Sequence, residues 1–425
     1  MSAHTRSERT IGRGRPRLGL IVAAAVAFGP ALLRAQKSAP PPSRPTIEAG
    51  ADTNDARSYY GYGMRMVYDK PSEAVRGFYW ASRINPNSAE VLYSLQCASL
   101  LAMSNDDMAD YFDYYGKNRK PQYLALDTLL VRAYSINPFL YPSFEHTLLR
   151  RQIEAEIIAR NPGVNRAIMN DRIMSYLNDA RFSARAAYAD GRMQEALAGY
   201  GKDLTYRGWS KKTRALATGD IHAIRARIFY VLGNLDSART EMAAAVSAMR
   251  ERDTTERVIL YRSKAMYEQS LGMVFERQDQ MDSARDAYGQ ALQEDLSYFP
   301  AHARLAQMAL AKGDTTTALT ELDLVVQLQP KDVVARYEYA IALVGTGHDA
   351  AAAAQLKSAI AADPYFAAPH LLLARIADVE QYAQDAAGEY QQYVALAPRS
   401  DPNLPFVKGR LSALAAAVSS TAATP

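Results

Sequence analysis

The histidines are the first residues to test for chemistry, because the chain has only six of them and a single cysteine, Cys97. His302 and His370 stand in similar surroundings in the sequence, a pattern that suggests paired metal ligands. Histidines this far apart on successive repeating elements do not converge on one ion, so packing within a helix is the favoured interpretation. His222 and His348 have no base or nucleophile beside them in the sequence.

The common catalytic motifs are missing from the sequence. It has no Gly-rich phosphate loop ending in Lys and Ser or Thr, no strand–Ser–helix elbow and no paired-His zinc helix. One cysteine forms neither an internal disulfide nor a cysteine-based metal site, and Cys97 on an apolar helix is expected to be a small buried side chain. We therefore expect a non-enzymatic protein without a metal or cofactor.

Composition is that of a protein with a packed core. Of the 425 residues 48% are hydrophobic, which is typical of a globular protein, and the formal charge is only +4. A nucleic-acid partner normally requires a concentrated basic face, so this charge gives no reason to expect one.

The N-terminus has the layout of a secretory signal peptide. Arg13, Arg15 and Arg17 precede an apolar run over 18–33, and small residues follow it, so we predict cleavage after Ala35. A retained signal anchor is the alternative. Arginine greatly outnumbers lysine in this Ala-rich chain, which favours a bacterial cell envelope, either periplasmic or, less favoured, anchored in the inner membrane. The Pro-rich stretch 36–54 is expected to be a poorly ordered linker.

A strict repeat organises the C-terminal half. Between residues 265 and 400 the same pattern returns with a constant period of 34, and alanine stands at one equivalent position of each unit: Ala284, Ala318, Ala352 and Ala386. Small residues also occupy the middle of each preceding helix, where neighbouring backbones approach closely: Gly272, Ala306, Ala340 and Ala374. Pro330, Pro364 and Pro398 close the last three units, because proline ends a helix.

These matches resemble the tetratricopeptide repeat (TPR). The resemblance implies an all-α fold, a right-handed α-solenoid of stacked antiparallel helix pairs, over about residues 55–401. It is strongest over 265–400. The predicted organisation is a signal peptide or anchor (1–35), a Pro-rich linker (36–54), an N-terminal repeat pair (55–122), an irregular helical region (123–176), two looser repeats (177–264), four regular repeats (265–400), and a capping helix with a tail (401–425).

The resemblance also implies a binding site. In the family, the first helices of the repeats line a concave groove that receives a peptide or a segment of a partner protein. The groove positions carried over to this chain mix polar, apolar and charged side chains: Arg227, Tyr230, Met266, Gln269, Met273, Glu276, Gln307, Tyr337, Ile341, Arg375 and Asp378.

The sequence thus predicts a non-catalytic protein–protein interaction scaffold of the bacterial envelope, whose partner is a protein or peptide. Two other hypotheses stay open. One is a structural subunit of an oligomeric envelope assembly, and the other is an accessory subunit of an enzyme that uses the irregular region 121–161.

Overall fold

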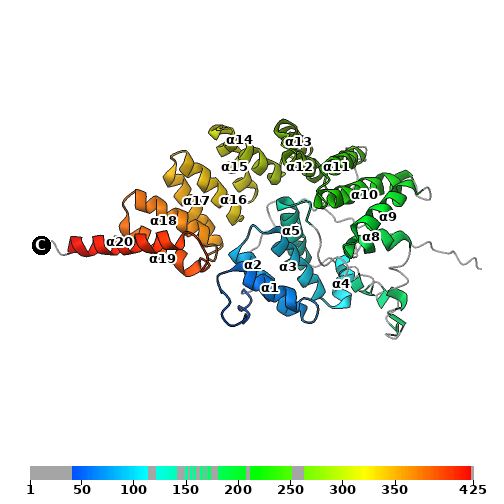
Figure 1. Ribbon diagram of the computed structural model, residues 1–425, viewed down its shortest axis with the longest axis horizontal. Helices are drawn as coiled ribbons and strands as arrows, with labels where there is room; N and C mark the ends of the chain where they lie inside the picture. Colours follow the sequence, from blue (N-terminus) through cyan, green and yellow to red (C-terminus); the bar gives the residue numbers. More distant parts are fainter. Residues whose placement is uncertain are drawn as a thin grey trace, which may run out of the picture.

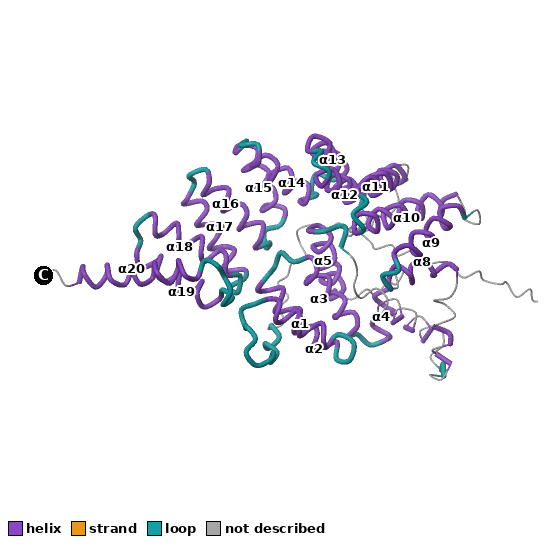
Figure 2. The backbone as a smooth tube through the Cα atoms, in the orientation of Figure 1, coloured by secondary structure: helices purple, strands orange, loops and turns teal. Residues whose placement is uncertain are grey.

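The computed structural model describes residues 41–112, 121–140, 180–206, 211–250 and 263–422, with scattered positions between 148 and 173. The predicted signal peptide (1–35) and part of the predicted irregular region (123–176) lie outside the described residues. Helices and the turns between them account for the structure of the described part, in which no strand occurs. Neighbouring helices pack in pairs as an α-solenoid, as the sequence predicts (Figures 1 and 2).

The solenoid runs from α8 to α20 and follows an arc (Figure 1). Its first helices belong to two less regular pairs: α8 (Ala180–Ala189) with α9 (Met193–Thr205), and α10 (Lys211–Val231) with α11 (Leu235–Arg250). The next four pairs are α12 (Lys264–Arg277) with α13 (Met281–Glu294), α14 (Phe299–Ala311) with α15 (Thr315–Leu328), α16 (Val333–Gly345) with α17 (Asp349–Ala362), and α18 (Ala367–Val379) with α19 (Ala383–Leu396).

The turn between the two helices has the same backbone conformation in each of these four pairs. Two residues after the end of each first helix stands a residue with positive φ, and these residues are again 34 positions apart: Asp279, Gly313, Gly347 and Gln381. Glycine adopts this left-handed conformation without a steric cost, whereas the two side-chain-bearing residues hold it because the flanking helices are already packed. The period of the sequence is therefore also a period of the turn geometry.

Several helices of the solenoid, α12, α15 and α16 among them, start at a side-chain cap. The Asp314 carboxylate accepts the backbone N–H of Thr317 at 3.1 Å, and the Asp332 carboxylate accepts those of Val334 and Ala335 at 2.9 and 3.3 Å. Ser263 caps α12 in the same way. These bonds satisfy amide groups that have no partner within the helix.

The helix α20 (Leu404–Ala422) covers the C-terminal end of the stack. Its apolar side chains Leu404, Val407, Leu411 and Leu414 pack with Tyr390 and Tyr393 of α19. A helix of this kind shields the apolar face that the last repeat would otherwise expose.

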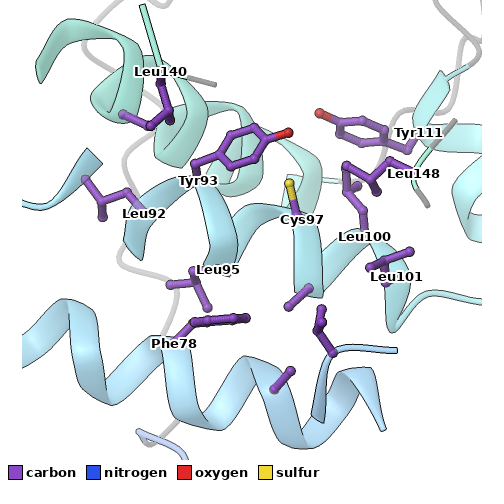
Figure 3. Packing of buried hydrophobic residues seen from close by; sticks show 14 of the residues in the cluster. Phe78, Leu92, Tyr93, Leu95, Cys97, Leu100, Leu101, Tyr111, Leu140 and Leu148 are labelled. Carbon is purple, nitrogen blue, oxygen red and sulfur yellow. The ribbon is translucent and has the colours of Figure 1, made fainter. Parts of the chain in front are cut away.

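The N-terminal part of the chain forms a second body inside the arc. It contains α1 (Ala56–Met66), α2 (Pro71–Ile84), α3 (Ala89–Leu101), α4 (Asn105–Phe112) and α5 (Pro121–Ile136). We call the described residues 41–112 and 121–140 the N-terminal module. Its core gathers around α3, and Cys97 is fully buried there among Phe78, Leu100 and Tyr111 (Figure 3). The prediction of a small buried cysteine is confirmed.

The predicted linker is not a loose segment from residue 41 onward. The indole N–H of Trp80 donates to the carbonyl oxygen of Pro42 at 2.8 Å, and the Arg76 guanidinium donates to the Ser43 hydroxyl at 2.9 Å. The Arg44 guanidinium lies 4.5 Å from the centre of the Trp80 ring. The expectation of a poorly ordered linker is therefore corrected for residues 41–54, because aromatic and arginine side chains of α2 hold them.

Candidate functional site

The concave side of the arc is formed by the first helices of the pairs, and the N-terminal module lies against it (Figure 1). The first set of contacts between the two joins α5 and its following turn to α10, α12 and the start of α16. Some of the predicted groove positions, such as Tyr230 and Gln269, are therefore placed in contacts within the chain.

An aromatic stack anchors the turn after α5. The rings of Phe139 and Tyr230 are 3.9 Å apart between centres and nearly parallel, at 12°. The guanidinium of Arg277 lies 4.5 Å from the centre of the same Tyr230 ring. Phe139 is only 2% exposed, so this ring is as buried as a core residue. Stacked aromatic pairs add about 0.5–1.5 kcal/mol beyond the area they bury.

Gln269 recognises the end of α5 through the backbone. Its side-chain amide donates to the carbonyl oxygen of Ser135 at 3.0 Å, and its own oxygen accepts the hydroxyl of Tyr298. The carbonyl groups of the last helical turn have no partner within the helix, so Ser135 is free to accept this bond. Gln269 is fully buried, and both halves of its amide are satisfied.

Two arginines join the same contact from opposite sides. The Arg227 guanidinium of α10 lies 4.8 Å from the centre of the Tyr134 ring of α5. Arg132 of α5 lies 3.6 Å from the carboxylate of Asp332, the residue that caps α16. Met266 is 2% exposed and belongs to the same apolar cluster as Phe139, so this predicted groove residue is part of the core.

A second contact joins the module to the C-terminal repeats. Arg83 of α2 pairs with Asp363 at 2.9 Å, where the carboxylate side chain is 5% exposed. Beside it the rings of Trp80 and Tyr365 meet edge to face at 4.9 Å between centres. Burial raises the pKa of Asp363 above its ordinary value, against the lowering effect of the Arg83 charge and of the Tyr365 backbone N–H.

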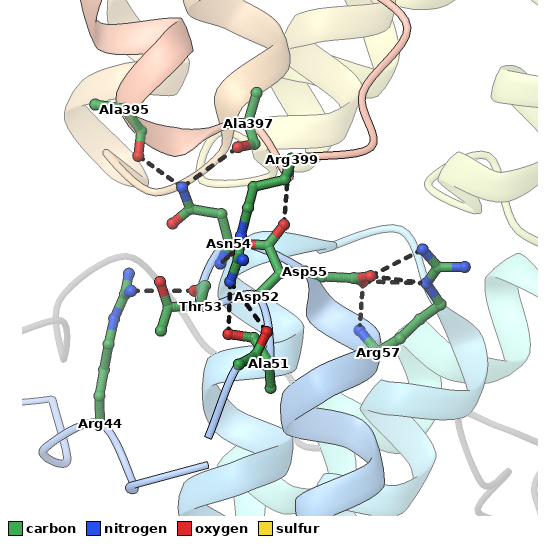
Figure 4. Close-up of polar contacts among 11 residues, drawn as sticks. Arg44, Ala51, Asp52, Thr53, Asn54, Asp55, Arg57, Ala395, Ala397 and Arg399 are labelled. Carbon is green, nitrogen blue, oxygen red and sulfur yellow. Dashed lines mark hydrogen bonds and ion pairs between the residues drawn. The ribbon is translucent and has the colours of Figure 1, made fainter. Parts of the chain in front are cut away.

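A third contact lies further along the same edge and joins residues 50–54 to residues 395–399 (Figure 4). The backbone N–H of Arg399 donates to Asp52 at 2.5 Å, and its guanidinium donates to the carbonyl oxygens of Gly50 and Ala51 at 3.3 and 2.8 Å. The Asn54 amide donates to the carbonyl oxygens of Ala395 and Ala397 at 2.7 and 3.3 Å. The module thus bridges the inside of the arc from α10 to the end of α19.

The remaining predicted groove positions divide into two groups. Arg375 and Asp378 contact the capping helix region: Arg375 donates to Asn403 at 3.4 Å, and Asp378 receives two bonds from Arg410 at 2.7 Å. Toward the middle of the arc, Gln307 and Ile341 are exposed, Ile341 by 46%. Tyr337 is half-buried against the ring of Phe366, Glu276 lies 3.8 Å from Arg304, and Met273 is half-buried. Their role in binding a partner stays a prediction.

Two cavities flank the end of α5. The larger, of about 320 Å³, is bordered by Asn137 and Phe139 of the turn, by Tyr60 and Tyr93 of the module, and by Tyr230 and Arg277 of the solenoid. The smaller, of about 230 Å³, lies between Arg132 and Ser135 on one side and Arg304, Asp332 and Glu338 on the other. Burial raises the pKa of Glu338 and the nearby Asp332 charge adds to this, while Arg304 opposes it. The contact between module and solenoid is therefore incompletely packed.

Three of the histidines pair with glutamates inside the repeats. His302 Nδ1 lies 2.5 Å from the Glu321 carboxylate, His370 Nδ1 lies 2.7 Å from Glu389, and His222 Nδ1 lies 2.6 Å from Glu241. In each case the glutamate follows 19 residues later, on the second helix of the pair. This spacing is a signal in the sequence that the prediction of simple packing did not use. Within the described part of the chain, no group of three or more His, Cys, Asp or Glu side chains is placed to hold a metal ion.

The His302–Glu321 pair predicts a pH dependence of stability. The hydrogen bond that His302 donates to the Glu321 carboxylate raises the pKa of His302 above its ordinary value, against the opposing effect of burial. A raised folded-state pKa means that the stabilisation is fully present below the unfolded pKa of about 6.5 and is lost as pH rises through the folded value. For the native chain, we expect the urea concentration at the unfolding midpoint to decrease as the pH is raised from 6 to 8. The part of this decrease that is due to His302 is expected to disappear in His302→Gln. Equal pH profiles for the two proteins would contradict this assignment.

Comparison with known proteins identifies the family to which the repeats belong. A model of the family described as tetratricopeptide repeat matches residues 309–376, which span α15 to α17, the end of α14 and most of α18. The match falls inside the block where helix pairs and turns share one period. The chain therefore contains tetratricopeptide repeats over these residues. No curated protein matches the chain.

Several solved structures of TPR proteins are similar to this chain at low sequence identity. The C-terminal part of a TPR protein from Cytophaga hutchinsonii is 17% identical with a TM-score of 0.41, covering 51% of this chain and 79% of that one. A TPR protein from Parabacteroides merdae is 14% identical with a TM-score of 0.34, covering 66% and 98%. Yeast Tom70 is 13% identical with a TM-score of 0.36, covering 86% and 96%. Among the described helices of this TPR protein, none combines the length and apolar character required to cross a membrane.

Proposed function

We propose that this TPR protein is a non-catalytic protein–protein interaction scaffold that receives a segment of a partner protein on the concave face of its solenoid. One observation carries the proposal: the concave face already holds a protein segment, the end of α5, through side chains of α10, α12 and α16. Aromatic, amide and carboxylate groups on these helices match a ring, a carbonyl and an arginine of the bound segment. Such mixed contacts are suited to peptide recognition.

The part of the concave face that the module leaves open is the proposed entry for a partner. Gln307 and Ile341 are exposed there, next to the half-buried Tyr337. An exposed apolar side chain gives a partner a contact area, and the amide and the tyrosine each give it a hydrogen-bonding group. We propose that these three residues, with Glu276 and Met273 beside them, make the first contact with a partner.

The cell envelope is the proposed location of the scaffold. Support comes from the basic and apolar pattern of the first 35 residues, which is typical of an export signal. N-terminal sequencing of the protein from its producing cells is expected to start at Gln36. A mature chain that starts at Met1 in the cytoplasm would overturn the proposed location.

Partner capture tests the scaffold function. We expect Ile341→Glu to lower the yield of co-purified partners from envelope fractions at least about tenfold, because a charge replaces an apolar contact worth about 1–2 kcal/mol. The matched control is Lys357→Glu, an exposed change on α17, the outer helix of the same pair. If both variants return the same partners at the native yield, the concave face is not the binding surface.

A further inference from the structure

The solenoid binds the end of α5 through contacts that depend on the residues of this segment. Three of these contacts lie along residues 132–139. Arg132 pairs with the Asp332 carboxylate, and the backbone carbonyl oxygen of Ser135 accepts a bond from the buried Gln269 amide. The Phe139 ring stacks on the ring of Tyr230. Each of these groups on the solenoid lies on a first helix or at its cap. A flat or purely apolar contact would place no demand on the sequence of the bound segment.

The shape of the bound segment is also specific. α5 ends at Ile136, and the Asn137 side-chain oxygen accepts the backbone N–H of Phe139 at 3.0 Å. This short turn, with Pro138 inside it, ends the helix and places the Phe139 ring on Tyr230. The recognised form is a helix C-terminus followed by an Asx turn that presents an aromatic side chain.

The contact is built so that it can be exchanged. Cavities of about 320 and about 230 Å³ border the segment on its two sides, whereas small side chains such as Ala306 and Ala340 are fully buried between the helices of the repeats. Empty space beside a bound segment forfeits dispersion contacts that a closely packed surface would gain. A partner with a larger side chain at the position of Ser135, which borders the smaller cavity, would fill space that this chain leaves open.

From these observations we infer that residues 132–139 are a built-in occupant of the concave face, and that the partner segment replacing them has the same pattern. That segment is a helix C-terminus with a basic side chain followed, seven residues later, by an aromatic one in an Asx-type turn. The inference rests on the proposed function and adds to it the class of partner. Binding then requires that the module first release the concave face, because two segments do not fit on Tyr230 and Gln269 together.

The test uses a labelled peptide of residues 121–140 and the full chain. A segment tethered in the same molecule competes at a high effective concentration, so the native chain is expected to bind the free peptide weakly. The double variant Arg132→Ala/Phe139→Ala removes two of the side-chain contacts that hold the built-in occupant, those to Asp332 and Tyr230. Fluorescence anisotropy is expected to show about tenfold or tighter binding of the peptide to this variant than to the native chain, because the binding-competent fraction rises.

Two controls make the recognition specific. A peptide with alanine in place of Phe139 is expected to lose binding to the double variant, and adding Tyr230→Ala to the double variant is expected to abolish binding of the native peptide. The single variant Phe139→Ala replaces the double one if circular dichroism shows loss of helix. Equal binding of the peptide to native and released chains, equal binding of both peptides, or no binding by the released chain would each overturn the inference.

The outcome is separable from that of the proposed function. If Ile341→Glu loses its partners while the released chain ignores the peptide, the scaffold function holds and the built-in occupant is refuted. If the released chain binds the peptide specifically while Ile341→Glu keeps every partner, the occupant is real and the entry for the partner lies elsewhere.

Discussion

Arg83→Met is expected to destabilise the folded chain by about 2 kcal/mol, because it leaves the buried Asp363 carboxylate without its cation. Asp363 lies between helices α17 and α18, and its carboxylate also accepts the Tyr365 backbone N–H at 3.1 Å. The cost stays below the roughly 3–5 kcal/mol of a fully buried pair because Arg83 is itself 29% exposed. Methionine keeps most of the aliphatic length, so the loss reports on charge. Urea unfolding measures it.

The pH dependence of this variant checks the cause. Burial already raises the pKa of Asp363 in the native chain, and removing Arg83 removes one of the influences that lower it. A carboxylate with a raised folded-state pKa favours the folded chain when protonated, so stability falls as pH rises through that pKa. The difference between Arg83→Met and the native chain is therefore expected to narrow as pH is lowered from 7 to 5.

A matched control separates this pair from an ordinary surface pair. Arg57 and Asp55 also form an ion pair, at 2.8 Å, but the Arg57 side chain is 81% exposed. Arg57→Met is expected to leave the unfolding midpoint unchanged, because exposed pairs are screened by water and salt. Equal losses for Arg57→Met and Arg83→Met would show that Asp363 is not buried beneath the module.

Gly272→Ala is expected to cost about 1–3 kcal/mol, although alanine is the better helix former. A β-carbon on Gly272 would lie 2.5 Å from the Tyr288 ring, which is fully buried and has no room to withdraw. Gly63 faces Phe78 in the same way in the module, with a distance of 2.6 Å. In these two pairs a glycine of the first helix faces a large ring of the second, whereas the last regular repeat combines Ala374 with Tyr390.

The repeats themselves supply the compensating change. Two neighbouring units pair alanine with leucine at these positions, as Ala306 with Leu322 and Ala340 with Leu356. Tyr288→Leu alone is expected to destabilise by leaving a cavity, whereas the double variant Gly272→Ala/Tyr288→Leu is expected to recover at least about 1 kcal/mol relative to the sum of the single changes. Strictly additive losses in urea unfolding would contradict this account of the packing.

The solenoid was predictable because its cause is local and repeated. A small residue, a positive-φ turn and a helix stop recur at one constant period, so each unit repeats the information of the last. The paired histidines were predictable only as far as their burial. Their glutamate partners, such as Glu321 for His302, required the two helices of a pair to be aligned side by side.

The position of the module was not predictable from the same pattern. Its contacts join residues hundreds of positions apart, Arg83 with Asp363 and Asp52 with Arg399, and no periodicity links these pairs. The groove positions could be predicted from the repeat, but the residues that contact them in the structure could not. Family analogy placed Met266 and Gln269 on an open surface, whereas both are buried and Gln269 bonds to the module. Arg375 and Asp378 are bonded to residues that follow α19.

The module's position in the concave face is tested most directly by photo-cross-linking from a benzoylphenylalanine placed at Tyr134. This half-buried aromatic of α5 lies under Arg227 of α10, so the substitution replaces one aromatic group with another. Irradiation of the full chain at low concentration is expected to give a cross-link within one chain, mapping by mass spectrometry to α10 near Arg227. Cross-links confined to residues 41–140, or formed only between two chains, would contradict the conclusion that the N-terminal module occupies the concave face of the same chain.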